Sequence, residues 1–151
     1  MTHTENEHTW AALAHASTLL NLAAPGLGGI IASLVIYLSF KERSIWVAFH
    51  ALQATLFQLL LLAAIIFIVG GSWIIGFIFS FITIGFGAFF AVPVMLITFF
   101  LGAFILLAGM AYGMYAAFQI NQGNDFIYFW AGNWAAQIIR SVRPERSSYN
   151  S

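Results

Sequence analysis

The sequence predicts an all-α fold, a polytopic bundle of transmembrane helices. Its longest uninterrupted feature is a run of 81 residues, from Ser44 to Asn124, without one Asp, Glu, Lys or Arg. Hydrophobic residues make up 62% of the 151-residue chain and charged residues only 7%, whereas soluble domains carry about a quarter charged residues. One bilayer crossing needs about 20 apolar residues, so the run has room for about three transmembrane helices. The lipid bilayer is therefore the expected surrounding of the chain.

Composition also excludes several classes of function. Five basic residues balance five acidic ones without forming a basic stripe, so nucleic acid is not an expected partner. Cysteine is absent, which excludes disulfides, thiolate metal sites and a cysteine nucleophile. Polar tails at 1–9 and 141–151 flank one expected transmembrane domain, residues 10–140. The first tail lacks Lys and Arg, so no cleaved signal peptide is expected.

The first hydrophobic segment runs from Trp10 to Phe40 and carries a break near its middle. Pro25 lacks a backbone N–H, and Gly26, Gly28 and Gly29 loosen the helix beside it. Freed backbone groups are tolerated in lipid only where they face protein or water. The sequence therefore predicts a kinked or broken helix whose break points into the bundle.

Three more apolar segments follow a charged turn at 41–43. They cover residues 46–69, 73–92 and 94–120, and they are separated by a Gly-Gly-Ser sequence at 70–72 and by Pro93. With the first segment they predict four crossings. Because Gly and Pro are common inside membrane helices, 73–92 can also be a re-entrant piece or an extension of its neighbours. Three crossings are therefore the alternative.

Basic residues set the expected orientation. Four crossings place both termini on one side of the membrane, together with Arg140, Arg143 and Arg146, and place Lys41 and Arg43 on the other side. Three basic residues against two favour cytoplasmic termini. Three crossings would instead gather all five basic residues on one side.

A short amphipathic stretch ends the hydrophobic part of the chain. Residues 126–140 mix aromatic side chains with Asn133, Gln137 and Arg140, and Trp130 and Trp134 share one line of a helix. This pattern predicts a short interfacial C-terminal helix at headgroup level. An ordinary cap packed on the bundle is the alternative.

Two stretches suggest a family. The first is Ser44 to Ala54, which follows the charged turn. The second contains Gly123, Asp125, Phe126, Tyr128 and Gly132. Together they resemble small bacterial membrane proteins of the domain of unknown function number 4870, which are related to the twenty-kilodalton Tic subunit of chloroplast import. In this chain Ile45 and Phe129 stand where that family usually has Pro.

The resemblance implies a helical protein of the bacterial inner membrane. It implies an accessory or translocation-related component. Because the apolar segments contain no nucleophile with an acidic partner, the residues themselves favour a non-enzymatic scaffold or subunit that packs as a homo-oligomer or in a larger membrane complex. The family supplies no catalytic residue and no cofactor, and none is predicted here.

Polar residues inside the apolar segments are the first functional candidates, because each needs a partner where water is absent. They are His15, Asn21, His50, Gln53 and Gln58. Structural hydrogen bonds between the first two segments are the main interpretation. A small channel or transporter, with the last four lining a path, is the alternative function.

Either histidine, His15 or His50, could also form a proton-sensitive site, since imidazole titrates near neutral pH. If the first segment is one crossing, however, His15 lies near the opposite face from His50, and the two should not meet. No Asp or Glu within the apolar segments could complete a metal site, so none is predicted.

A stripe of glycines marks the last long segment. Gly102, Gly109 and Gly113 recur on one side of the expected helix, where backbones can approach closely. Packing inside the bundle is the main interpretation, and a homodimer or partner-subunit interface is the alternative.

Overall fold

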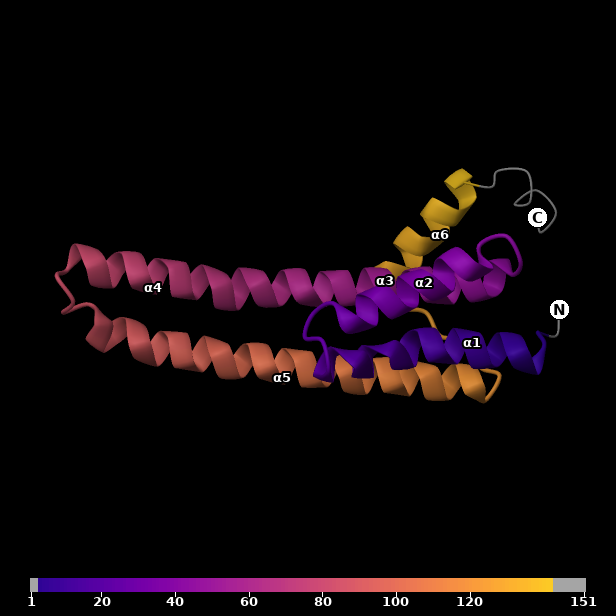
Figure 1. Ribbon diagram of the computed structural model, residues 1–151, viewed down its shortest axis with the longest axis horizontal. Helices are drawn as coiled ribbons and strands as arrows, with labels where there is room; N and C mark the ends of the chain where they lie inside the picture. Colours follow the sequence, from indigo (N-terminus) through magenta and orange to yellow (C-terminus); the bar gives the residue numbers. More distant parts are fainter. Residues whose placement is uncertain (1–2, 143–151) are drawn as a thin grey trace. The chain divides into compact units, whose positions relative to one another are not determined.

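The computed structural model describes residues 3–142, which form helices, turns and loops without a strand (Figure 1). The helices are α1 (Glu5–Ala16), the 3₁₀ helix η1 (Ser17–Leu22), α2 (Gly28–Phe40), α3 (Ile45–Ile65), the π-helix η2 (Ile66–Gly70), α4 (Gly71–Ile82), α5 (Ala88–Asn121) and α6 (Ala131–Val142). The prediction of an all-α fold is confirmed. The chain divides into two compact units, a first unit up to Leu59 and from Met110 onward, and a second unit from Leu60 to Gly109.

The first hydrophobic segment is a helical hairpin. α1 and α2 pack against each other, and the rings of Trp10 and Phe40 lie 5.3 Å apart, so the start of α1 meets the end of α2 (Figure 1). The reversal occurs at the predicted break, where Gly26 has a φ of 80°. The break is therefore confirmed, but α2 has 13 residues, shorter than the roughly 20 that a crossing needs.

The start of α1 is tied to the start of α3. Thr4 caps α1: its hydroxyl accepts a hydrogen bond from the Glu7 N–H, and the Glu7 carboxylate accepts one from the Thr4 N–H. The other carboxylate oxygen of Glu7 accepts a hydrogen bond of 2.6 Å from the Ser44 hydroxyl. Residues 5–9, which were expected in the polar N-terminal tail, are thus the start of α1. The helix begins there because Thr4 and Glu7 form a complete capping box. Most of the other expected tail, 143–151, lies outside the described residues.

Replacing Glu7 with alanine is expected to cost about 1 kcal/mol of stability at neutral pH, because it removes the cap and the tie to Ser44. The Ser44 hydroxyl, and then the Thr4 backbone, hold the pKa of Glu7 below its usual 4.5. The contribution of the carboxylate is therefore complete above that value and is lost as the pH falls through the lower folded-state pKa. Unfolding in detergent, followed by circular dichroism at pH 7 and in acid, measures it. The matched variant is Glu5→Ala, and equal losses in both would contradict the expectation.

α3, η2 and α4 form one continuous helical run from Ile45 to Ile82, 38 residues long. The Gly-Gly-Ser sequence does not end it: Gly70 and Gly71 both keep helical backbone angles. The chain reverses later, at 83–87, where Ile84 and Gly85 have φ angles of 53° and 84°. Pro93 lies inside α5.

The separate third crossing expected at 73–92 is therefore wrong. Its first part continues the helix before it, and its last residues begin α5. This agrees with the alternative that 73–92 extends its neighbouring helices. Ile45–Ile82 and Ala88–Asn121 are the two described helices long and apolar enough to cross a membrane. Glycine did not interrupt the first of these because its cost inside a helix is only about 1 kcal/mol per residue.

In the second unit, α4 lies antiparallel to the first part of α5 (Figure 1). The Ser72 and Thr98 hydroxyls lie 2.7 Å apart, and the Trp73 indole donates to the Met95 carbonyl at 3.3 Å. The unit otherwise presents apolar side chains outward, and Phe81 is 87% exposed. Such a surface is stable against acyl chains or other apolar helices and not against water.

Candidate functional site

Among the described residues of the first unit, nine polar residues are buried. They come from the hairpin and from α3, and they are His15, Ser17, Thr18, Asn21, Ser33, His50, Gln53, Thr55 and Gln58. A buried polar group without a partner costs free energy, so the partners of these side chains decide what they do. Six of them form two clusters, one at the break of the hairpin (Ser17, Asn21 and Gln58) and one beside the loop that follows α5 (His15, His50 and Gln53).

The first is an amide cluster at the hairpin break. Asn21 donates from its amide nitrogen to Gln58 Oε1 at 3.3 Å, and its oxygen accepts from the Gly29 N–H at 3.2 Å. Gln58 in turn donates to the Ser17 hydroxyl at 3.2 Å. A Cβ on Gly29 would collide with Gln58 Oε1 and the Ser17 carbonyl. The cluster therefore satisfies backbone groups exposed by the break and ties both arms of the hairpin to α3.

The second is a histidine cluster built around Gln53. Gln53 Nε2 donates to the Phe126 carbonyl at 2.8 Å, and Gln53 Oε1 accepts from the Tyr128 N–H at 3.2 Å. These two backbone groups are of opposite type, so they fix which end of the amide is nitrogen. Gln53 Nε2 also lies 2.9 Å from His50 Nδ1. His50 Nδ1 is therefore an acceptor.

That assignment determines which nitrogen of each imidazole carries the proton. With Nδ1 accepting, neutral His50 carries its proton on Nε2, which lies 3.9 Å from Asp125 Oδ1. His15 Nε2 lies 3.3 Å from the same His50 Nδ1 and must donate to it. His15 Nδ1 is then left to accept from the Tyr128 hydroxyl at 3.1 Å. The hydrogen bonds run in one direction, from Tyr128 through His15 to His50, whose remaining N–H faces Asp125.

Burial differs sharply along this chain of groups. His15, His50 and Tyr128 are at most 2% exposed, whereas the Asp125 side chain is 75% exposed and accepts from the Trp46 indole at 3.1 Å. Burial, with a smaller effect of Tyr112, raises the pKa of Tyr128, so its phenol keeps the proton that it donates. A proton added to His50 Nδ1 would remove the acceptor that Gln53 and His15 share. The cluster therefore requires neutral imidazoles.

The expectation that the two histidines do not meet was wrong. It assumed that 10–40 crosses the membrane once, whereas the hairpin brings His15 level with His50. In the range 3–142 no group of three or more His, Asp or Glu side chains is placed to hold a metal ion.

The residues predicted for a channel separate into the two clusters. Asn21 and Gln58 belong to the amide cluster, and His50 and Gln53 to the histidine cluster. Each is at most 4% exposed and is hydrogen-bonded to another protein group. This arrangement favours structural hydrogen bonding over a water-filled path.

The motif residues 123–132 cover the connection from α5 to α6 and the first two residues of α6. Gly123 has a φ of 83° and ends α5, while the Phe126 and Tyr128 backbone groups bind Gln53. A Cβ on Gly132 would meet the Ile127 side chain and, at 3.2 Å, Gln53 Oε1. The motif therefore docks this connection on α3.

The glycine stripe is divided between the units. In the second unit, Gly102 faces the Val69 side chain and Gly109 faces Leu61. In the first unit, Gly113 lies against Thr18, whose side chain a Cβ would meet at 2.7 Å. Each glycine thus lies at a close approach within one copy of the chain.

Sequence reasoning missed two contributors. Trp46 packs on His50 with ring centroids 4.5 Å apart and also binds Asp125, and His8 Nδ1 lies 2.9 Å from the Ile120 carbonyl. The spacing of four residues between Trp46 and His50, on one side of a helix, was the available signal.

The comparison with family models corrects the expected relationship. The resemblance to the domain of unknown function number 4870 and to the Tic subunit is not supported. Residues 6–135 instead match the model of another family, and this range includes both polar clusters and both long apolar helices. Searches of curated proteins and of solved structures found no match. Because the match covers most of the 151 residues, the chain belongs to the magnetosome magnetite crystal formation protein family.

Proposed function

We propose that this protein is a non-enzymatic component of the magnetosome membrane that takes part in magnetite crystal formation. The family match over residues 6–135 carries the proposal. The two long apolar helices, with outward-facing Phe and Ile side chains, support a position within the bilayer. The buried polar groups support a structural role, because they bind one another and the backbone.

The protein acts by packing with other membrane subunits or with further copies of itself. The two polar clusters tie the hairpin and the 123–130 connection to α3. Gly102 and Gly109 already pack against Val69 and Leu61 of the same chain. The outward Phe and Ile side chains of the second unit are therefore the better surface for contact with another protein. Partners are thus met through apolar surface.

Deletion of the gene in a magnetite-forming bacterium tests the proposal. Electron microscopy should show crystals that differ in size, shape or number from those of the parent strain. The chain should also be recovered in purified magnetosome membranes and resist extraction by carbonate. Normal crystals in the deletion strain, or a chain confined to the soluble fraction, would contradict the proposal.

The chain crosses the membrane twice in this proposal. The hairpin enters and leaves on one side, and the helices at 45–82 and 88–121 cross out and back. The start of α1, the 41–44 loop and the end of α5 meet in the first unit through Glu7, Ser44 and His8. All three described basic residues, Lys41, Arg43 and Arg140, lie in this unit, so under the positive-inside rule the end of the unit with the 41–44 loop faces the cytoplasm.

Single introduced cysteines test this topology directly, because the natural chain has none. Glu5→Cys, Arg43→Cys and Asn124→Cys should all react with an impermeant maleimide from the cytoplasmic side. Ile84→Cys should react only from the opposite side, since Ile84 is 96% exposed in the turn between the two long helices. Labelling of positions 5 and 43 from opposite sides would show that the first segment crosses once and would overturn the hairpin.

A further inference from the structure

α6 has an apolar face that the rest of the first unit does not cover. Ala131, Gly132 and Ala135 are buried and anchor its N-terminal half. On another side, an exposed stripe of residues four apart runs along the helix: Trp130, Trp134, Ile138 and Val142. A helix with aromatic and aliphatic residues on one side and polar residues on another is suited to the headgroup boundary of a bilayer.

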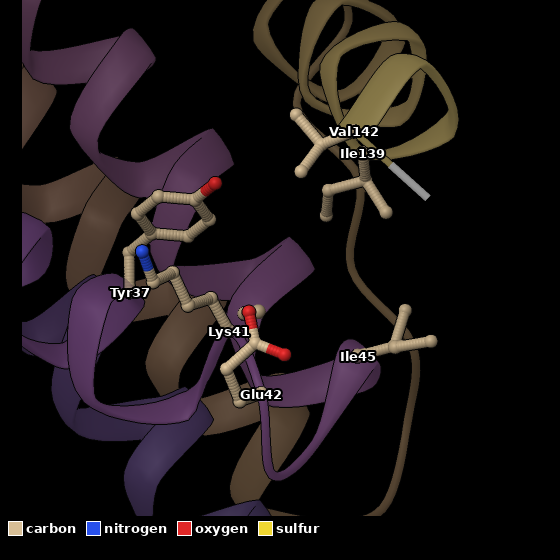
Figure 2. A pocket seen from close by; sticks show the side chains of 7 residues that line it. Tyr37, Lys41, Glu42, Ile45, Ile139 and Val142 are labelled. Carbon is tan, nitrogen blue, oxygen red and sulfur yellow. The ribbon is translucent and has the colours of Figure 1, made fainter. Parts of the chain in front are cut away.

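Beneath the C-terminal half of α6 is a pocket of about 260 Å³, here called the wedge. Its lining is Tyr37, Lys41, Glu42, Ile45, Ala48, Ile139 and Val142. Figure 2 shows Ile139 and Val142 pointing from α6 into a gap bordered by Tyr37 and Ile45, with Lys41 and Glu42 at one end. Val142 belongs both to the wedge and to the exposed stripe, so the two apolar surfaces are continuous.

Charge is distributed unevenly around the wedge. Lys41 lines it, Arg43 follows in the same loop, and Arg140 lies on α6 between two wedge residues. No ion pair engages Lys41 within residues 3–142. Glu42 also lines the wedge and keeps the local excess of positive charge small. A site with apolar walls and one available ammonium group suits a ligand with one negative charge and a hydrocarbon body.

We infer that the wedge binds one anionic phospholipid of the surrounding bilayer. Its phosphate pairs with Lys41, and its glycerol and the first part of an acyl chain lie against Tyr37, Ile45, Ile139 and Val142. A free phosphate would gain nothing from these apolar walls, and a water-soluble ligand would not explain the continuity with the exposed stripe of α6. The inference rests on the membrane position proposed above.

Native mass spectrometry of the purified protein in mild detergent tests the site. With added phosphatidylglycerol, one lipid should remain bound, and phosphatidylcholine should be retained less. Lys41→Ala should weaken phosphatidylglycerol retention about fivefold, the effect of losing one close basic residue. Ile139→Trp, which fills the wedge without changing charge, should also remove the bound lipid. Circular dichroism must show both variants folded.

The matched control is Arg43→Ala, which removes the same charge from the same loop but not from the wedge. Retention should stay near that of the natural chain. Equal losses in Lys41→Ala and Arg43→Ala, or no loss in Lys41→Ala and Ile139→Trp, would overturn the inference. So would displacement of the lipid by inorganic phosphate, which would identify a simple anion site. Failure of the membrane proposal would appear separately, as extraction of the chain by carbonate.

Discussion

Replacing Gln53 with leucine is expected to destabilise the protein by about 3 kcal/mol, because two backbone groups lose their partner and a buried imidazole loses one of its two donors. The Phe126 carbonyl loses its donor, the Tyr128 N–H loses its acceptor, and His50 Nδ1 loses one of two donors. Leucine has a similar volume, so the loss reports hydrogen bonding more than packing. The measurement is thermal unfolding in detergent followed by circular dichroism.

Gln122→Leu is the matched control, because it replaces glutamine with leucine at an exposed position. Gln122 directly precedes the same connection. It should alter stability by less than about 0.5 kcal/mol. Limited proteolysis should cut the 123–130 connection faster in Gln53→Leu than in Gln122→Leu, because Gln53 holds its backbone. Equal stability and equal cleavage of the two variants would show that Gln53 does not lock this connection.

The apolar composition predicted the all-helical fold, and the polar residues within it predicted the buried candidates. His15, Asn21, His50, Gln53 and Gln58 are all buried, because an isolated polar side chain in an apolar helix is placed where it finds a partner. What hydropathy could not predict is which groups they bind. A hairpin of two short helices and one kinked crossing have the same apolar composition, so the pairing of His15 with His50 depends on tertiary structure alone.

The position of the chain reversal was misjudged for a local reason. The Gly-Gly-Ser sequence at 70–72 was the expected boundary, whereas the chain reverses at 83–87, which also contains two glycines. There Thr83 supports the turn, since its hydroxyl accepts a hydrogen bond of 2.7 Å from the Gly87 N–H. At 70–72 the Ser72 hydroxyl instead donates to the Val69 carbonyl, as serine commonly does inside membrane helices.

A single added methyl group at Gly29 should have a large effect on the packing of the hairpin against α3. A Cβ there would collide with Gln58 Oε1 and lie 2.7 Å from the Ser17 carbonyl. Neither atom can move freely, because Gln58 is held by Asn21 and Ser17, and the Ser17 carbonyl is backbone. Gly29→Ala therefore either displaces Gln58 or separates the hairpin from α3. The expected loss is about 3 kcal/mol, the upper range for overpacking in a close-packed interior.

The same substitution at Gly71 separates this effect from the loss of glycine itself. Gly71 has helical backbone angles and nothing within 4 Å of an added Cβ, so Gly71→Ala should stabilise the helix by about 0.5 to 1 kcal/mol. The two Gly→Ala changes should thus shift the unfolding midpoint in opposite directions. If Gly29→Ala also removes Gln58 from its site, adding Gln58→Ala should recover part of the loss, because the shorter side chain leaves room for the methyl group. A Gly29→Ala protein as stable as the natural chain would show that the hairpin does not pack on α3 through this glycine.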